Sequence, residues 1–418
     1  MRAIAIPHET FTLDNGLHVV LHCDPSLPQV VVNLWYDVGS RDEAPGRSGF
    51  AHLFEHLMFM GTARTPGGSF DELMESSGAW NNAWTSSDAT DYFEVGPPAI
   101  VDTLLWLEAD RMSGLADAMT QEKLDLQRDV VKNERRQTHE DAPYGELWLV
   151  LGEAMYPSGH PYAHPVIGSH EDLEAATVSD VIAFFREFYV PNNASLAVAG
   201  DFDPAAVRAS IEHTFGPIPR GQRPAHARPA RVDRPQKSVL ELTDKVQIAQ
   251  TNFFWHAPAA YEPGDAELDF VALVLGDGRA SRFYERLVQS GLAIEVDASQ
   301  QSLPLGSLFS TTAMPTEDHT VEELETAIGE EIERLATDGP TPEELERARN
   351  QVQSDFLHGL ESLRSRATIL NRYWASKGRA DFIAHDLERY RSVTAEGVRE
   401  AAARLTPERR LTARVRPE

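Results

Sequence analysis

The sequence contains one succession of patterns twice, and this repeat limits the folds that the chain can adopt. Each copy has an aromatic-rich strand pattern, a helix pattern that begins with threonine and acids, and then a helix followed by a strand. The paired stretches are VNLWY (32–36) with TNFFW (251–255), TQEKLDLQRDVVKNE (120–134) with TPEELERARNQVQSD (341–355), and VSDVIAFFREFYVPNNASLAVAG (178–200) with VTAEGVREAAARLTPERRLTARV (393–415). Because the pairs recur in the same order, at offsets of 215–221 residues, we expect two copies of one α+β unit.

A stretch near the middle of the chain separates the two copies. GPIPRGQRPAHARPARVDRPQKS, from Gly216 to Ser238, is rich in proline and arginine and has almost no large apolar residue, so it predicts a linker. The length of 418 residues also suits two domains of about 200 residues better than one hydrophobic core. We therefore predict homologous domains at 1–217 and 239–418, joined by a linker at 218–238. Each domain is expected to be an antiparallel sheet with helices packed on it.

The opening of the first copy, FTLDNGLHVVLH, indicates a β-hairpin. Asn15-Gly16 is a strong signal for a two-residue turn and lies between two strand segments with alternating apolar residues. We expect the paired strands to form one edge of the sheet.

The charge of the chain excludes some classes of partner. The formal net charge is −27, whereas phosphate backbones and anionic membranes are bound mainly through clustered Lys and Arg. We therefore expect no nucleic-acid partner and no membrane partner. No apolar run approaches the roughly 20 residues that span a bilayer, and the N-terminus lacks the long apolar core of a secretory signal. A cytoplasmic location is expected, or a periplasmic one if the N-terminus is processed.

The stretch HLFEHLMFMGT, residues 52–62, places three polar side chains in an otherwise apolar run, where each needs a partner. On a helix, His52 and His56 lie four residues apart and project from one face, with Glu55 on the same side. Two imidazoles at that spacing can bind one metal ion, and H-x-x-E-H is the inverse of the H-E-x-x-H zinc motif. The single cysteine, Cys23, leaves His and carboxylates as the available ligands. A helix with two hydrogen-bonded histidines and no metal is the alternative.

A catalytic zinc ion usually has three protein ligands and an open fourth position, so a third ligand is expected elsewhere in the chain. Glu134, in VVKNERRQ on the helix that begins near Thr120, is the best candidate. Its counterpart in the repeat is Asp355, and the stretch that matches HLFEH, AELDFVALVLG (266–276), contains no histidine. The metal site is therefore expected in the first copy only.

These motifs resemble those of the inverzincin metallopeptidases, the family of pitrilysin, insulysin and the mitochondrial processing peptidase. The resemblance rests on HLFEHLMFMGT, GAWNNAWTSSDATDYF and VVKNERRQ, and it covers nearly the whole chain, including GHPYAHPVIG, FYVPNNASLAVAGDFDP and LGDGRASRFYERL. It implies that His52, His56 and Glu134 bind one zinc ion (Zn2+) and that Glu55 is the general base. Chains of this length in the family are clamshell halves that pair into a chamber, so the resemblance also implies a peptide substrate and two subunits.

The stretch NNAWT (81–85) is similar to the family's substrate-side edge strand, to which an extended peptide would add by main-chain hydrogen bonds. Asn82 and Ala83 match the family's NA pair, and Trp84 either shapes a side-chain pocket or packs in the core. Many relatives have a second glutamate seven residues before the zinc-binding one, where this chain has Gln127. We expect Gln127 either to orient a neighbour of the metal or to lie on a solvated helix face.

The second half departs from the family pattern. In self-sufficient relatives an arginine and, seven residues later, a tyrosine reach the substrate near zinc, but ERLVQSGLAIEV places Leu287 and Ile294 at those positions. Apolar side chains cannot donate hydrogen bonds to a developing oxyanion. We therefore expect a heterodimer, in preference to a homodimer, in which a homologous partner subunit supplies the Arg and the Tyr.

The leading hypothesis is a zinc-dependent endopeptidase that cleaves short or unfolded peptides, with this chain as the zinc-bearing subunit. A non-catalytic structural or peptide-holding subunit of the same fold is the main alternative, and a zinc hydrolase with a non-peptide substrate is a third. The intact H-x-x-E-H and Glu134 favour the first hypothesis, because an assembly subunit has no chemical need for them.

Overall fold

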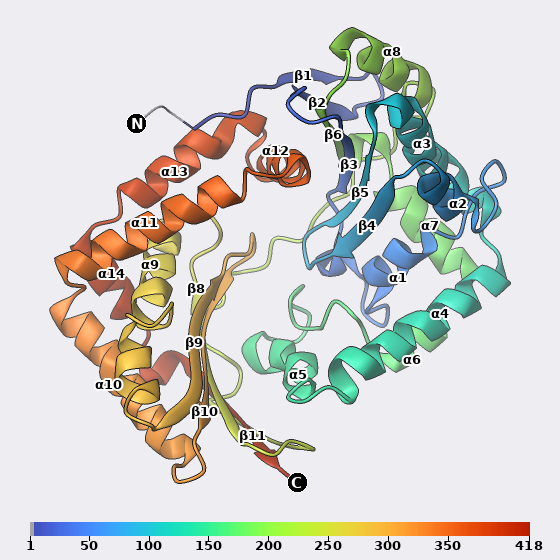
Figure 1. Ribbon diagram of the computed structural model, residues 1–418. Coiled ribbons are helices and arrows are strands. Elements are labelled where there is room, and N and C mark those ends of the chain that lie inside the picture. The colour runs from blue at the N-terminus through green and yellow to red at the C-terminus, as the bar shows by residue number, and fades with distance from the viewer. Residues whose placement is uncertain (1–3) are drawn as a thin grey trace. The chain divides into compact units, whose positions relative to one another are not determined.

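Two sheets, each covered by helices, make up the structure, a computed structural model that describes residues 4–418 (Figure 1). The sheets belong to two compact units of the chain. Unit 1 contains the residues up to Arg135, Pro165–Ala227 and Leu357–Ala384, and unit 2 contains Arg136–His164, Arg228–Phe356 and His385–Glu418. The predicted α+β class, with two similar combinations of sheet and helices, is confirmed.

The sheet of unit 1 has six strands in the order β1-β2-β6-β3-β5-β4. The strands are β1 (Glu9–Thr12), β2 (His18–Cys23), β3 (Val30–Tyr36), β4 (Trp80–Thr85), β5 (Thr90–Gly96) and β6 (Ala194–Gly200). Neighbours are antiparallel except for β2 and β6, which are parallel. Three other strands lie between these two in the sequence, so no hairpin connects them. The sheet is therefore antiparallel as predicted, except for this one parallel pair. β4 lies at one edge and, within residues 4–418, has β5 as its one partner.

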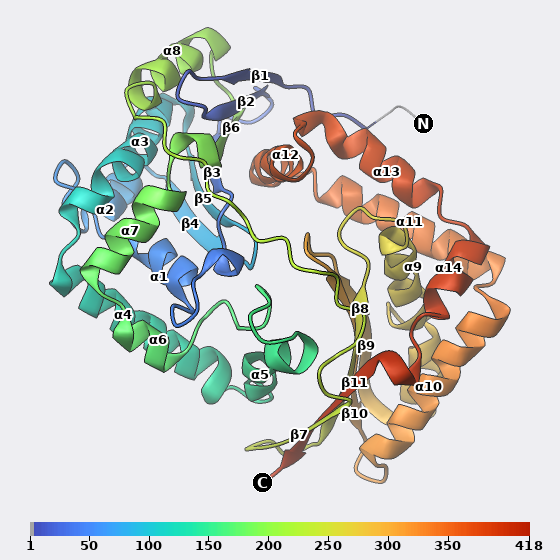
Figure 2. The same cartoon turned by 180° about the vertical axis from the view of Figure 1, so that it is seen from behind.

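Helices cover both faces of the unit 1 sheet (Figures 1 and 2). α1 packs against β4 and β5 and α3 against β3 on one face, whereas α12 packs against β2, β3 and β6 on the other. The helices of this unit are α1 (Phe50–Leu57), α2 (Ser69–Ser76), α3 (Val101–Ala118), α4 (Gln121–Arg135), α6 (His170–Ala175), α7 (Val178–Phe188), α8 (Pro204–Phe215) and α12 (Leu363–Lys377). The site residues predicted from the sequence all lie on α1, α4 and β4 of this unit.

The sheet of unit 2 has the order β7-β11-β8-β10-β9, again with one parallel pair, β7 and β11. Its strands are β7 (Val239–Asp244), β8 (Gln250–Ala257), β9 (Ala293–Gln301), β10 (Ser307–Pro315) and β11 (Arg410–Pro417). Its helices are α5 (Glu146–Met155), α9 (Asp265–Leu275), α10 (Val321–Asp338), most of α11 (Pro342–His358) and of α13 (Ile383–Arg391), and α14 (Ala395–Ala402). Leu324, Ile328 and Leu335 of α10 recur at helical spacing and are buried, which explains why this acidic helix packs on the sheet.

α5 and α12 occupy corresponding places in the repeat, and each belongs to the unit that is built mainly from the other half of the chain. α5 follows α4 in sequence and packs against β7 and β11. Leu147 and Leu151 of α5 are buried in one apolar cluster with Phe254 and Leu411 of the unit 2 sheet. The sequence repeat and the compact units therefore divide the chain at different places.

The connection between β1 and β2 is longer than the predicted two-residue turn. Leu13 N donates to Leu17 O at 2.9 Å, and Gly16, with φ at 93°, donates its N–H to Leu13 O at 2.8 Å. The buried side-chain amide of Asn15 donates to Phe215 O at 2.8 Å, at the end of α8. This tertiary hydrogen bond attaches the loop to the end of α8. The expectation that the hairpin forms one edge of the sheet is confirmed.

Residues 218–238, the predicted linker, form no helix or strand, but His226 within it packs onto unit 1. Its Nδ1 lies 2.8 Å from Asp42 Oδ1, and its Nε2 lies 3.3 Å from Asp37 Oδ2. Hydrogen bonds to these two carboxylates raise the pKa of His226 to about 9. The first part of the segment, up to residue 227, is therefore held to unit 1 by a charged histidine at neutral pH.

The free energy of unfolding is expected to depend on pH through His226. The pKa of His226 is about 9 in the folded chain and 6.5 ordinarily, so its contribution is complete below pH 6.5 and is lost as the pH rises through 9. Urea unfolding of wild type and His226→Gln should show a stability difference at about pH 6 that disappears at about pH 10. A difference of equal size at both pH values would contradict this account.

Candidate metal centre

α1 begins at a turn that glycine makes without strain. Gly49 precedes the helix with φ at 90°, and a Cβ at this position would lie 2.8 Å from the carbonyl oxygen of Ile167. The carboxylate of Glu43 accepts hydrogen bonds from the backbone N–H groups of Gly49 and Ala51, at 2.9 and 2.8 Å. These bonds satisfy donors that the first turn of a helix leaves unpaired. The start of α1 is thereby fixed just before the H-x-x-E-H residues.

The helix predicted over HLFEH is confirmed, and it is amphipathic. Leu53, Phe54 and Leu57 are buried in unit 1, with at most 1% of each residue exposed. His52 and His56 project from another side of the helix, towards Glu134 of α4, against which α1 packs, whereas Glu55 faces Thr85 of β4. The apolar residues of the run therefore form the core, and the two histidines lie at the contact between α1 and α4.

The structure brings together the three residues predicted as metal ligands. Glu134 lies near the C-terminal end of α4, and its two carboxylate oxygens face the two histidines separately. Oε1 lies 3.6 Å from His52 Nε2, and Oε2 lies 3.2 Å from His56 Nε2. The side chains of His52, His56 and Glu134 are 12%, 23% and 37% exposed, so the cluster is accessible from one side.

The donor set of this cluster fits a zinc ion. One ligand atom from each of the three residues can be chosen so that all lie within 4.8 Å of one another, close enough to surround a single cation. Two imidazole nitrogens and one carboxylate oxygen are a known set for catalytic zinc, which keeps a fourth position open. Within residues 4–418 this is the one group of three or more His, Cys, Asp or Glu residues that meets this distance criterion.

Glu55 lies beside the three ligands but has a different partner. The hydroxyl of Thr85, the last residue of β4, donates a hydrogen bond of 2.6 Å to Glu55 Oε2. Burial raises the pKa of Glu55, and this hydrogen bond acts in the opposite direction. Thr85 was not among the residues singled out from the sequence. The signal for it was the alternation of side chains along NNAWT, which places Thr85 two residues after Ala83 on the same face of the strand.

β4 has the properties of a strand that can accept another strand. Its one neighbour in the sheet is β5, so its second edge is unpaired in the described chain. Asn82 is exposed, and its side-chain oxygen accepts a hydrogen bond of 2.8 Å from the backbone N–H of Ala83. Trp84 is half-buried and packs edge-to-face on Trp35, with ring centroids 5.2 Å apart. Trp84 therefore makes a packing contact within the sheet, on the face opposite to Thr85.

The remaining predicted positions have other neighbours within their own units. The side-chain amide of Gln127 is 2.8 Å from the sulfur of Met60, which follows α1. In unit 2, Leu287 is fully buried in the apolar core, and Ile294, on β9, is 50% exposed. One of the two expected donor positions is thus in the core, and the other presents an apolar side chain to solvent.

Two family descriptions match the sequence. Residues 18–155 match the description "Insulinase (Peptidase family M16)", and residues 175–352 match "Peptidase M16 inactive domain". His52, Glu55, His56 and Glu134 all lie within the first match. No helix within residues 4–418 is both long and apolar enough to cross a lipid bilayer.

Several curated relatives and solved structures are similar to this chain. The zinc protease PqqE of Helicobacter pylori is 30% identical over 360 residues, which cover 85% of this chain and 80% of the relative. An uncharacterized zinc protease of Bacillus subtilis, YmxG, is 25% identical over 359 residues, 85% of each chain. The crystal structure of a protease from Helicobacter pylori superposes with a TM-score of 0.89 at 27% identity, covering 99% of this chain and 100% of that one. An M16 inactive domain from Pseudomonas fluorescens has the same fold, with a TM-score of 0.87 at 18% identity, covering 99% of this chain and 98% of that one.

Proposed function

This chain belongs to the M16 peptidase family, and we propose that it is a zinc-dependent endopeptidase that cleaves short or unfolded peptides. The observation that carries the proposal is the position of Glu134, whose two oxygens face His52 and His56, while Glu55 remains outside this set. An assembly subunit would have no chemical need for such a cluster. The match to the domain described as inactive begins at residue 175, after all four of these residues.

The proposed mechanism assigns one task to each side chain. His52, His56 and Glu134 would hold the zinc ion. The ion would polarise the carbonyl of the peptide bond and make the attacking water more acidic. Glu55 accepts the proton of the attacking water and delivers it to the leaving amine nitrogen of the peptide. Thr85 holds Glu55 in one orientation through its 2.6 Å hydrogen bond.

An extended peptide is the substrate that fits β4. The unpaired edge of this strand would bind the peptide through main-chain hydrogen bonds, next to Asn82 and Ala83. Because β4 ends at Thr85, the bound peptide would run past Glu55. Backbone recognition of this kind favours short or unfolded peptides over folded proteins, in which backbone groups are already paired.

We also propose that a homologous partner subunit completes the catalytic site. Leu287 and Ile294 stand where an arginine and a tyrosine are expected in self-sufficient relatives, and neither can donate a hydrogen bond to an oxyanion. The partner would supply these donors, and the pair would act as a heterodimer. The chain expressed alone should therefore cleave more slowly than the protein isolated with its bound subunits, and equal rates would contradict the pairing.

The test of the proposed function is cleavage of a quenched fluorescent peptide by zinc-loaded protein, isolated so that any bound subunit is retained. We expect Glu55→Gln to lower the rate by about 10²–10⁴-fold, the usual contribution of a general base. The zinc content of this variant should stay unchanged, because Glu55 is not a ligand. Cleavage that persists in Glu55→Gln, or that survives removal of the metal, would rule out the proposed chemistry.

A further inference from the structure

Arg364, the second residue of α12, is an exposed cation in unit 1. The central carbon of its guanidinium lies 4.9 Å from the centre of the Phe93 ring on β5. In the sheet register, Phe93 is paired with Asn82 of β4. Residues paired in this way point to the same face of a sheet. Arg364 therefore lies over the face to which Asn82 points, next to the strand whose second edge is unpaired.

This face of β4 is accessible to solvent. Trp80, Asn82 and Trp84 share it, because alternate residues of a strand point to the same side. Trp80 is 50% exposed, and its ring packs edge-to-face on Phe93, with centroids 5.6 Å apart. Asn82 is exposed as well. We call this group, Trp80, Asn82, Phe93 and Arg364, the ledge.

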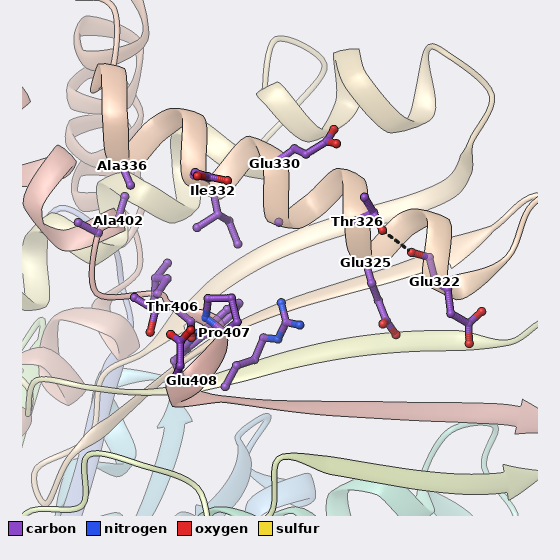
Figure 3. A pocket seen from close by; sticks show the side chains of 16 residues that line it. Glu322, Glu325, Thr326, Glu330, Ile332, Ala336, Ala402, Thr406, Pro407 and Glu408 are labelled. Carbon is purple, nitrogen blue, oxygen red and sulfur yellow. Dashed lines mark hydrogen bonds between the residues drawn. The ribbon is translucent and has the colours of Figure 1, made fainter.

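The Arg364 side chain has no anionic partner, although carboxylates are abundant. The chain has 65 Asp and Glu residues for 38 Lys and Arg. In unit 2, for example, Glu322 and Glu325 of α10 (Figure 3) pair with Arg416 and Arg414 at 2.5 and 2.6 Å. Within residues 4–418, by contrast, the Arg364 side chain forms no ion pair and donates no hydrogen bond. Its N–H groups are therefore available to a ligand.

Two carboxyl groups near Arg364 in the structure or in the sequence do not neutralise it. Asp91 of β5 is fully buried, and burial raises its pKa well above the ordinary value, against the hydrogen bond from Asn33 and the charge of Arg364. Burial thus favours the uncharged form of Asp91. Glu361, which precedes α12, lies 4.0 Å from the imidazole of His358 instead. The guanidinium therefore stays uncompensated.

The position of Arg364 does not serve the stability of α12. The N-terminal end of a helix carries a partial positive charge and favours anions, so a cation in the first turn is unfavourable. The first turn of α12 contains no acidic residue that would offset it. A carboxylate bound at the guanidinium would interact favourably with Arg364 and with the end of the helix.

A peptide strand added to β4 would bring its side chains within reach of Arg364. Neighbouring strands are about 4.8 Å apart, so the added strand would lie about 10 Å from β5, on which Phe93 carries the guanidinium. Every second side chain of the peptide would point to the ledge. The long side chains of arginine and glutamate can meet across this distance, above Asn82.

We propose that Arg364 binds the carboxylate of an aspartate or glutamate side chain of the substrate peptide, at a position that faces the ledge. The inference rests on the proposed function, because it takes the ligand of β4 to be a substrate. The net charge of −27 disfavours acidic residues at every position of a peptide. A preference for Glu at particular positions is therefore the signature of this local cation.

The test measures the binding of fluorescent peptides of ten residues, acetylated and amidated at their ends, by fluorescence anisotropy. The protein is the zinc-loaded Glu55→Gln variant, isolated with any bound subunit, so that the peptides are not consumed. In a neutral parent sequence, Glu, Gln or Lys is placed at one position at a time. The cleavage site in wild-type protein, located by mass spectrometry, sets the register.

We expect Glu to bind about 3–5-fold more tightly than Gln at one position, or at two positions two residues apart, as for an exposed ion pair. Adding Arg364→Gln should abolish this difference, and adding Arg364→Glu should favour Lys at the same positions. Arg372→Gln is the control, because Arg372 is also exposed on α12 but lies about two turns further along. This variant should keep the preference for Glu.

Failure of the inference is distinguishable from failure of the proposed function. Position-dependent binding that requires Arg364, without cleavage by wild-type protein, would contradict the peptidase and support the subsite. Cleavage with no preference for Glu, or with a preference that survives Arg364→Gln, would overturn the subsite alone. Absence of binding by every peptide would overturn it too. So would an effect of Arg364→Gln confined to peptides with a free C-terminus, because the ligand would then be the terminal carboxylate.

Discussion

Glu134→Gln is expected to lower the zinc affinity of the chain by at least about 100-fold. The carboxylate of Glu134 faces His52 Nε2 and His56 Nε2 at 3.6 and 3.2 Å, and it is the one anionic member of the cluster. The substitution keeps the size of the side chain but removes the charge that offsets the cation. Even the loss of a group that only orients a metal ligand costs about 10–100-fold in affinity, so the loss of a ligand costs more.

The chain provides a matched control for this prediction. Asp355 occupies the corresponding position on α11, is exposed and has no histidines in the matching stretch of its own unit. Asp355→Asn removes the same charge from the corresponding helix, so it reports any general effect of charge on zinc binding. Competition with a chromophoric chelator should show wild-type affinity for Asp355→Asn and the large loss for Glu134→Gln. Equal affinities for the two variants would exclude Glu134 as a ligand.

Arg111→Ala is expected to lower the free energy of unfolding by about 3–5 kcal/mol, the usual cost of removing one partner from a buried ion pair. Arg111 is 3% exposed and pairs with Glu94 and Glu108, both fully buried in unit 1. Burial and the neighbouring Glu108 carboxylate raise the pKa of Glu94. The guanidinium also lies over the rings of Tyr92 and Phe59, and Phe59 is the second residue after α1. Without it, two carboxyl groups remain in the core with no cation.

Arg186→Ala is the control for this prediction, because Arg186 pairs with Asp117 at the surface of the same unit. Their side chains are 66% and 82% exposed, and pairs of this kind contribute about 0–1 kcal/mol. Adding Glu108→Ala to Arg111→Ala should recover part of the lost stability, since one stranded carboxyl group is removed. Urea unfolding measures the free energy of unfolding of each variant. An Arg111→Ala variant as stable as Arg186→Ala would show that the buried cluster contributes little.

Much of the fold is predictable from the sequence because it follows from local patterns. The strands at 30–36 and 250–257 and the helices that begin after Thr120 and Thr341 have their own periodicity and caps. The exchange of α5 and α12 between the units is not predictable in this way. Both helices have ordinary amphipathic patterns, and the sheet that each one covers is decided by contacts far along the chain, such as those of α5 with β11.

In the candidate site, too, the features that depend on local sequence are predictable, and those that depend on tertiary contacts are not. The i, i+4 spacing of His52 and His56 can be read directly, because a helix converts it into a shared face. The contact between Thr85 and Glu55 depends on how β4 pairs with β5 and on how α1 lies against both strands. The sequence therefore yields the candidate ligands but not the residue that holds the proposed base.

The most direct test of the central claim is anomalous diffraction at the zinc absorption edge from crystals of the zinc-loaded chain. The account predicts one peak about 2 Å from His52 Nε2, His56 Nε2 and a Glu134 oxygen, with Glu55 outside the ligand set and hydrogen-bonded to Thr85. A peak at another place in the chain, or one in which Glu55 replaces Glu134 as the third ligand, would contradict it.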